Sequence, residues 1–313
     1  MPRKNNDAVY DVAVVGGGPG GYSAALYCVR AGLSTLVLEQ LSPGGQMATT
    51  TQIDNYPGFD EGIDGMELAE RMQRGAERFG AVTAYETVTA LELDAMPRRI
   101  VTSRGVRQAR AVILAPGASP RQLGLPEEDK MRGRGVAYCA ACDGMFYRGK
   151  TVAVIGGGNS AAADALTLSK LCTRVYLVHR RDKLRAEHSY LQPLEQAENV
   201  TFVWNSTPAG FVTENGKLRA VTLTDTGSGQ TRELACDGVF VAIGRKPDTE
   251  FLPEAIVRDD AGYILADETT RTSVPGVFAV GDARTKPLRQ IVTAAADGAV
   301  AASCAQAYIA SLS

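Results

Sequence analysis

Two cysteines with the spacing of a redox pair, Cys139 and Cys142, stand near the middle of the chain, and Asp143 follows directly. A Cys-X-X-Cys pair closes a small disulfide ring that reduction opens again, and one thiol of such a pair usually has a lowered pKa. The carboxyl group of Asp143 is placed to move the proton that the second thiol gains or loses. We therefore predict thiol–disulfide chemistry at these three residues.

A structural bridge or half of a zinc site would use the same cysteine spacing. A zinc site needs a second pair of ligands with similar spacing. The other cysteines are isolated in the sequence: Cys28, Cys172, Cys236 and Cys304. The two histidines, His179 and His188, form no ligand pattern, and His188 reads as an ordinary helix residue. We therefore expect no metal, and the source of the electrons must be sought elsewhere in the chain.

Length and composition limit the class of protein. The 313 residues are enough for two domains, and 45% hydrophobic and 22% charged residues are ordinary for a soluble globular protein. A net charge of -2 and 6% aromatic residues give no reason to expect nucleic acid. Residues 1–7 lack an apolar signal core, and residues 294–310 are too polar to span a bilayer, so we expect no membrane and a cytoplasmic location. In a reducing cytosol such a cysteine pair is more often catalytic than structural.

A nucleotide-binding pattern opens the chain. Residues 10–15 predict a strand, residues 22–31 a helix, and residues 35–38 a second strand that ends at Glu39. The loop between the first strand and the helix reads G-X-G-X-X-G over residues 16–21. Its first glycine permits a tight turn, its second lets the backbone approach a pyrophosphate, and its third lets helix pack on strand. Glu39 is placed to accept hydrogen bonds from a ribose, as in FAD or NAD.

The same pattern returns in the middle of the chain, with one difference. Residues 151–155 and 174–178 predict strands around a helix at 159–171, and residues 156–161 read G-X-G-X-X-A. In place of the acid the second copy has basic residues: His179, Arg180, Arg181 and, a little further, Arg185. A carboxylate would repel a 2′-phosphate, whereas guanidinium groups bind one through paired hydrogen bonds. The second site is therefore predicted to prefer NADP(H).

The remaining segments alternate between predicted strands and helices. We expect helices at residues 63–79 and 288–309, strands within 83–114, 200–238, 239–243 and 277–280, and linkers at 117–126 and 247–248. Asp282, which closes the last strand, is placed either to bind a polyol hydroxyl or to cap a helix. Spacing alone assigns no role to residues 44–46 and 55–58, which read as surface loops.

Taken together, the motifs resemble low-molecular-weight, bacterial-type thioredoxin reductase of the class II pyridine nucleotide-disulfide oxidoreductase family. The resemblance covers nearly the whole chain and rests on motifs in one order: Asn55–Gly58, Cys139–Gly144, Gly156–Ala161, His179–Asp182 with Arg185, Gly281-Asp282 and Arg289-Gln290. It implies an α/β fold with two Rossmann-like dinucleotide-binding domains. The FAD domain would comprise residues 1–119 and 248–313, and the inserted NADPH domain, residues 120–247, would carry the cysteine pair. It also implies a homodimer.

The resemblance assigns roles by motif position. The FAD-binding residues would be Gly16, Gly18, Pro19, Gly21, Glu39, Gly45, Gln46, Asn55, Ala115, Gly117, Gly281, Asp282, Arg289, Gln290 and Ile291. The NADPH-binding residues would be Gly156, Gly158, Asn159, Ser160, Ala161, His179, Arg180, Arg181, Arg185, Ile243 and Gly244. Cys142 would face the flavin, Cys139 would attack the disulfide of thioredoxin, and Asp143 would donate the proton. Electrons would pass from NADPH through FAD and the Cys139–Cys142 disulfide to oxidised thioredoxin.

The chain departs from the family pattern at three places. Pro116 stands where the family usually has Thr, which bears on a flavin hydrogen bond. Ala140-Ala141 stands between the cysteines where Ala-Thr is frequent, and Ala163 and Asp164 replace a common pair of Glu after the second glycine loop. The last change bears on the details of pyridine-nucleotide binding. None of the three removes a redox-essential group.

Other functions use parts of the same pattern. A related flavoprotein reductase or oxidase could act on a different dithiol or disulfide carrier, because no motif marks the acceptor surface. A ferredoxin-linked flavoprotein is disfavoured, since such relatives lose the basic cluster that this chain keeps. A non-catalytic flavin-binding scaffold or sensor is disfavoured by the retention of both cysteines beside Asp143.

Overall fold

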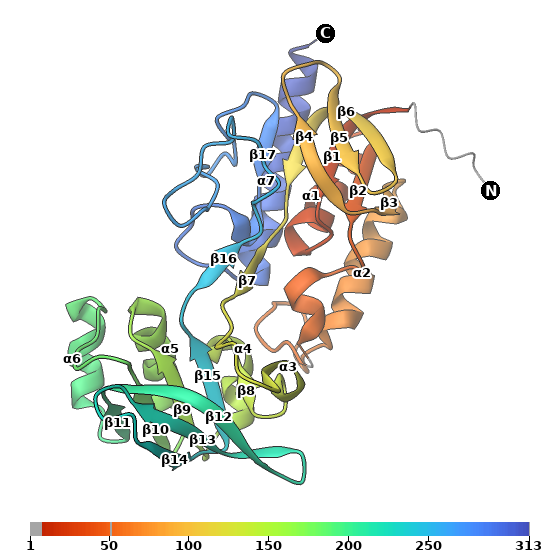
Figure 1. Ribbon diagram of the computed structural model, residues 1–313. Helices are drawn as coiled ribbons and strands as arrows, with labels where there is room; N and C mark the ends of the chain where they lie inside the picture. The colour runs from red at the N-terminus through yellow and green to blue at the C-terminus, as the bar shows by residue number, and fades with distance from the viewer. Residues whose placement is uncertain (1–7, 51, 313) are drawn as a thin grey trace. The chain divides into compact units, whose positions relative to one another are not determined.

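The computed structural model describes residues 8–50 and 52–312 (Figure 1), so the segment that bears on targeting, residues 1–7, lies outside the described part. The chain divides into two compact units, the first formed by Met1–Ser119 with Lys246–Ser313 and the second by Pro120–Arg245. Within the described residues, no helix is long and apolar enough to cross a membrane.

The first unit is built on a seven-stranded sheet with the order β3-β2-β1-β6-β5-β4, in which β17 also pairs with β6. Its strands are β1 (Val9–Val15), β2 (Thr35–Glu39), β3 (Val82–Tyr85), β4 (Val88–Glu92), β5 (Arg98–Thr102), β6 (Gly105–Leu114) and β17 (Val277–Ala279). The strands β3, β2, β1, β6 and β17 run parallel, whereas β4, β5 and β6 pair antiparallel. Side chains of β1 alternate between two cores, Val12 and Val14 in one and Ala13 and Val15 in the other. Apolar cover on both faces explains why this strand reads as an unbroken apolar run.

Among its described residues, the first unit has three α-helices: α1 (Pro19–Arg30), α2 (Gly65–Glu77) and α7 (Ile291–Ala310). Two 3-10 turns accompany them, η1 (Gly45–Thr49) and η3 (Gly281–Ala283). Glycines let α1 and α7 lie close together. A Cβ atom at Gly298 would be only 2.3 Å from the Gly20 carbonyl oxygen, so no larger residue fits there. The two helices that were predicted from residues 63 and 288 begin later, and capping residues are the reason. The Asp64 carboxylate accepts from Met66 and Glu67 amides before α2, and Gln290 forms a reciprocal cap with Thr293 before α7.

The second unit repeats the arrangement on a five-stranded parallel sheet with the order β11-β10-β9-β15-β8. Its strands are β8 (Val136–Ala137), β9 (Thr151–Gly156), β10 (Arg174–Val178), β11 (Val200–Val203) and β15 (Gly238–Ala242). A three-stranded antiparallel sheet adds β12 (Ser206–Glu214), β13 (Lys217–Asp225) and β14 (Thr231–Ala235). The helices are α3 (Glu128–Met131), α4 (Ala140–Asp143), α5 (Asn159–Ser169) and α6 (His188–Gln196), with the 3-10 turn η2 (Gly144–Tyr147) after α4. The predicted fold class, α/β with two Rossmann-like halves, is confirmed.

The segments that connect the two units are more regular than the sequence indicates. Residues 117–126 and 247–248 were predicted as linkers, but β7 (Ala118–Pro120) and β16 (Arg245–Pro247) pair as a two-stranded sheet. Backbone hydrogen bonds extend the pairing at both ends, from Arg121 N to Gly244 O at 2.9 Å and from Asp248 N to Gly117 O at 3.0 Å. The prolines that suggested loops are accommodated because proline is tolerated in edge strands.

Candidate redox centre and nucleotide-binding loops

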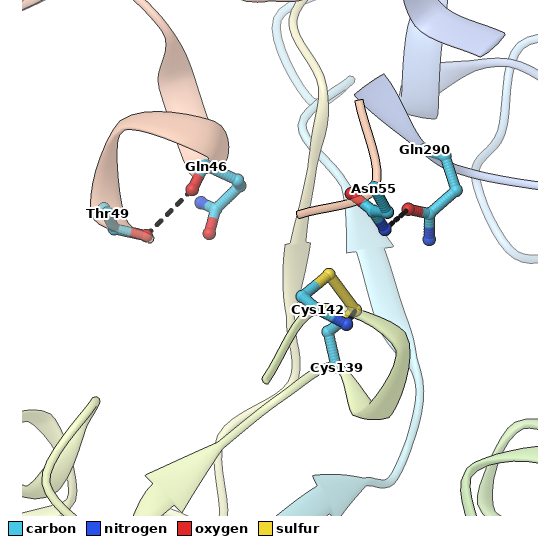
Figure 2. The surroundings of a disulfide bond; sticks show 6 residues. All are labelled: Gln46, Thr49, Asn55, Cys139, Cys142 and Gln290. Atoms are coloured by element: carbon cyan, nitrogen blue, oxygen red, sulfur yellow. Dashed lines mark hydrogen bonds between the residues drawn. A yellow bond between two sulfur atoms is a disulfide. The ribbon is translucent and has the colours of Figure 1, made fainter. Parts of the chain in front are cut away.

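The cysteine pair lies on a tight turn that follows β8. Cys139 has extended backbone angles and caps α4, and its carbonyl oxygen accepts from the amide of Asp143 at 3.0 Å. This turn brings Cys139 and Cys142 into a disulfide with a Cα–Cα distance of 5.3 Å (Figure 2). The Cys142 amide also donates to Cys139 Sγ at 3.2 Å. A thiolate at Cys139 would therefore have a hydrogen-bond donor already in place.

Asp143, the last residue of α4, has the protonation behaviour of a group that exchanges protons near neutral pH. Burial raises the pKa of its carboxyl to about 6, and the nearby Arg132 guanidinium opposes that rise. A carboxyl group with a pKa close to the working pH is suited to general acid–base catalysis. No motif predicts that Arg132 acts on Asp143, because only the fold brings the two side chains near each other.

A second carboxyl group also contacts the cysteine turn. Asp164 of α5 accepts a hydrogen bond from the amide of Ala140, which directly follows Cys139. Burial raises the pKa of Asp164 to about 6, while Arg245 opposes the shift. Asp164 is one of the departures from the family pattern, and it connects the helix after the second glycine loop to the redox turn.

The first glycine loop, between β1 and α1, has the geometry that its sequence predicts. Gly16 has a φ of 104°, and a Cβ atom there would lie 2.2 Å from the Ala115 carbonyl oxygen, so only glycine fits. A Cβ atom at Gly21 would lie 1.9 Å from the Gly16 carbonyl oxygen. Glu39 Oε2 accepts from the Gly17 amide at 2.7 Å. The acid at the end of β2 is thus fixed beside the loop.

Neighbouring segments of the first unit complete this loop. The Gly44 amide donates to the Gly17 carbonyl at 2.7 Å, which brings residues 44–46 against the first glycine loop. Asn55 Nδ2 donates to Gln290 Oε1 at 3.1 Å, so two predicted cofactor-binding side chains from distant segments meet (Figure 2). Pro19 is the first residue of α1. Ala115 and Gly117 follow β6, and the Ala115 carbonyl lies beside Gly16. Spacing could not have related residues 44–46 to the loop, since the contact is made by backbone atoms.

A buried cluster of charged side chains contacts the backbone at Gly281, shortly after β17. Asp297 of α7 accepts from the Gly281 amide at 2.9 Å, from Arg284 Nη2 at 2.8 Å and from Lys286 Nζ at 2.7 Å. The two cations lower the pKa of Asp297 against the rise that burial causes. Sequence reasoning missed the role of Asp297, although an isolated acid in an alanine-rich helix was a visible signal. On the other side, Arg289 Nε donates to the Asp282 carbonyl at 3.2 Å, just before Gln290 and Ile291.

The second glycine loop, between β9 and α5, repeats the first. A Cβ atom at Gly156 would lie 2.4 Å from the Ala242 carbonyl oxygen, as Gly16 meets Ala115 in the first unit. Ile243 and Gly244 follow Ala242 and therefore lie at the same end of the sheet. Asn159 exchanges two hydrogen bonds with Glu187, from Nδ2 to Oε1 at 2.8 Å and from the Glu187 amide to Oδ1 at 2.9 Å. Glu187 was not predicted, and no motif marks it.

The basic residues near this loop divide into two kinds. His179 is only 6% exposed and lies beneath the loop, where a Cβ atom at Gly157 would be 2.2 Å from His179 Nδ1. Its burial lowers the pKa of the imidazole, which favours the neutral form of the ring. Arg180, Arg181 and Arg185 are exposed and form no ion pair with any described residue. The structure thus gives His179 a supporting position and leaves three guanidinium groups open to an anion.

Both loops fit the phosphates of a dinucleotide. The N-cap residues, Gly18 before α1 and Gly158 before α5, carry no side chain, and neither helix has an acid in its first turn. The first-turn amides therefore keep their hydrogens for another acceptor, and the helix dipole favours an anion there. A Cβ atom at Gly158 would meet nothing within 4 Å, so space lies directly over the loop that Ser160 and Ala161 continue. Residues 8–50 and 52–312 contain no cluster of His, Cys, Asp and Glu arranged to hold a metal ion.

Comparison with known proteins agrees with this arrangement. The family model described as pyridine nucleotide-disulphide oxidoreductase matches residues 10–298. The thioredoxin reductase of Treponema pallidum is 47% identical over 300 residues, which are 96% of this chain and 97% of that protein. That of Bacillus subtilis is 44% identical over 306 residues, covering 97% and 96%. The crystal structure of thioredoxin reductase from Streptococcus pyogenes superposes with a TM-score of 0.91 at 40% identity, covering 98% of this chain and all 100% of the other.

Proposed function

The chain belongs to the pyridine nucleotide-disulphide oxidoreductase family, and we propose that it is a thioredoxin reductase, which reduces the disulfide of thioredoxin with electrons from NADPH. The observation that carries the proposal is the Cys139–Cys142 disulfide with Asp143 beside it. The same unit also holds the exposed basic cluster, Arg180, Arg181 and Arg185, that we propose binds NADPH. The nucleotide that supplies the electrons would therefore bind in the unit that carries the cysteine pair.

We assign FAD to the first unit and NADPH to the second. The support is the fit of the two glycine loops, Glu39 beside the first and the exposed arginines beside the second. Bound FAD would convert the hydride of NADPH into an electron pair that a disulfide accepts. The chain itself supplies first-turn amides for each pyrophosphate, and Arg180, Arg181 and Arg185 for a 2′-phosphate.

The thiols act in sequence once the disulfide is reduced. Cys139 Sγ attacks one sulfur of the thioredoxin disulfide, forming a mixed disulfide and releasing the other sulfur as a thiolate. Cys142 Sγ then attacks Cys139 Sγ, which re-forms the Cys139–Cys142 bond and releases the second thioredoxin sulfur. The Cys142 amide, 3.2 Å from Cys139 Sγ, stabilises the attacking thiolate. The Asp143 carboxyl gives the leaving thiolate a proton, for which its raised pKa of about 6 is suited.

We also propose that the enzyme is a cytoplasmic homodimer, as the family resemblance implies. In the first unit several large apolar side chains are exposed, among them Tyr27 at the end of α1 and Phe79, Val82 and Tyr85 after α2. Exposed apolar side chains gathered on neighbouring elements are typical of a surface that a second copy covers. Light scattering of the purified protein would report the mass of one or of two chains.

The direct test is a coupled assay with NADPH, thioredoxin and a disulfide dye that reduced thioredoxin bleaches. We expect dye reduction that requires thioredoxin and fails in Cys139→Ser and Cys142→Ser. A protein that oxidises NADPH but leaves every thioredoxin oxidised acts on another carrier, and one that oxidises no NADPH is not a reductase. Arg174→Ala, a change at an exposed arginine of β10 outside both loops, serves as the matched control.

A further inference from the structure

Glu128 is a buried carboxylate of the second unit that the proposed chemistry does not use. It is only 3% exposed, and none of the ion pairs between described residues includes it. Its oxygens accept instead from the amides of Leu123 and Gly124, both at 2.9 Å, from the amide of Leu125 at 3.3 Å, and from Tyr138 Oη at 2.7 Å.

Such a carboxylate is costly unless hydrogen bonds replace its water. An isolated buried charge is strongly unfavourable, and donors from backbone and side chain compensate it. Three of the four donors belong to residues 123–125, which follow the connecting strand β7. The fourth belongs to Tyr138, the residue directly before Cys139. One carboxylate therefore joins the chain entering the second unit to the chain entering the cysteine turn.

Tyr138 is held on two sides. Its hydroxyl is bound to Glu128, and the Arg132 guanidinium lies over its ring at 5.0 Å from the centroid. The same Arg132 acts electrostatically on Asp143, on the far side of the cysteine turn. The ring also packs against the apolar cluster that contains Val136 and Val239. These contacts of the Tyr138 side chain therefore fix the direction in which the backbone enters Cys139.

We propose that the Glu128–Tyr138 hydrogen bond is a positioning contact for Cys139, which holds the turn so that the two thiols of the reduced pair stay within reach of each other. The proposal rests on the proposed function only in taking this pair as the redox pair. Glu128 and Tyr138 touch no reacting atom in this scheme and act through the backbone at Cys139.

The expected effect follows from the closure of the disulfide ring. A hydrogen bond to a charged acceptor, such as the one from Tyr138 to Glu128, stabilises the conformation in which it forms. Part of this stabilisation keeps the cysteine turn ordered when the two cysteines are reduced. Without it the thiols sample more conformations and meet less often. We expect the equilibrium constant for forming the Cys139–Cys142 bond to fall about threefold to tenfold, which raises the reduction potential by roughly 15–30 mV.

The test compares Tyr138→Phe with the unmutated protein as the full chain with bound flavin. Phenylalanine keeps the ring, its packing and the contact with Arg132, and removes only the hydroxyl. The matched control is Tyr176→Phe, because Tyr176 packs against the same apolar cluster and its hydroxyl forms no hydrogen bond with a described residue. Each protein is equilibrated without oxygen in dithiothreitol buffers of graded potential, trapped with an alkylating reagent, and analysed by mass spectrometry of the peptide that contains both cysteines.

The proposal predicts a higher potential for Tyr138→Phe and no change for Tyr176→Phe. Glu128→Gln should shift the potential in the same direction, and the double variant should shift it no further than the larger single change. An unchanged potential in Tyr138→Phe would overturn the proposal, even if Glu128→Gln does not fold. The buffers replace NADPH, so the measured potential does not depend on whether the unmutated protein reduces thioredoxin. If the unmutated protein does not reduce thioredoxin, that result refutes the proposed function and leaves the positioning contact untouched.

Discussion

Replacing Asp143 with Asn should make the second unit more stable at neutral pH and the enzyme much less active. Burial raises the pKa of this carboxyl from 3.8 to about 6. Between those two pH values the folded protein binds more protons than the unfolded chain, so the free energy of unfolding falls as the pH rises through this window. Above it, the folded protein retains a partly buried charge that Asn does not carry.

The size of the effect follows from the pKa shift. A rise from 3.8 to about 6 is about 2 pKa units, or roughly 3 kcal/mol at most, and the attraction of Arg132 is already contained in it. We expect Asp143→Asn to gain about 2 kcal/mol at pH 7.5 and nothing at pH 4. Loss of the proton donor should slow thioredoxin reduction on the order of a hundredfold.

Urea unfolding followed by tryptophan fluorescence measures this gain, because the single tryptophan, Trp204, belongs to the second unit. The free energies of both proteins should converge as the pH falls from 7.5 to 4. Asp164→Asn is the companion variant, since burial also raises the pKa of Asp164 to about 6 but the residue is not the proposed donor. It should gain stability and keep its activity. A less stable Asp143→Asn at pH 7.5, or one with full activity, would refute the reasoning.

Three further predictions concern the cofactors and the two thiols. The purified protein should be yellow and release FAD on denaturation, and chromatography that finds FMN or no flavin contradicts this. It should use NADPH in preference to NADH, and Arg180→Ala with Arg181→Ala should weaken NADPH binding roughly ten- to a hundredfold while leaving NADH little changed; equal kcat/KM for both nucleotides in the unmutated protein would disprove the assignment. In Cys142→Ser, Cys139 should trap thioredoxin as a mixed disulfide once the partner carries an activated thiol, whereas Cys139→Ser should trap little on a non-reducing gel. Trapping by the opposite variant would reverse the two roles.

Local sequence patterns predicted the two glycine loops and the strands around them. Gly16 and Gly156 are required because the backbone there approaches a neighbouring strand, and this requirement produces the glycine spacing that is visible in the sequence. Cys139 and Cys142 are also visible in the sequence, because their spacing of three residues is what lets one tight turn bring them together.

Contacts between segments distant in the sequence could not be predicted. The bond from the Gly281 amide to Asp297, the pairing of Asn159 with Glu187, and the position of His179 beneath its loop depend on how helices pack on strands. Helix ends moved for a related reason: α7 begins at residue 291 because side chains of Gln290 and Thr293 cap it, whereas apolar periodicity alone extends the helix to residue 288.

The central claim, that electrons from NADPH reach the Cys139–Cys142 disulfide, has a direct measurement. The flavin-loaded protein is mixed with excess NADPH without oxygen, alkylated, and digested for mass spectrometry. The account predicts that both cysteines carry the alkyl label after NADPH and neither does without it. A pair that stays disulfide-bonded in NADPH, yet is labelled after dithiothreitol, would contradict the claim.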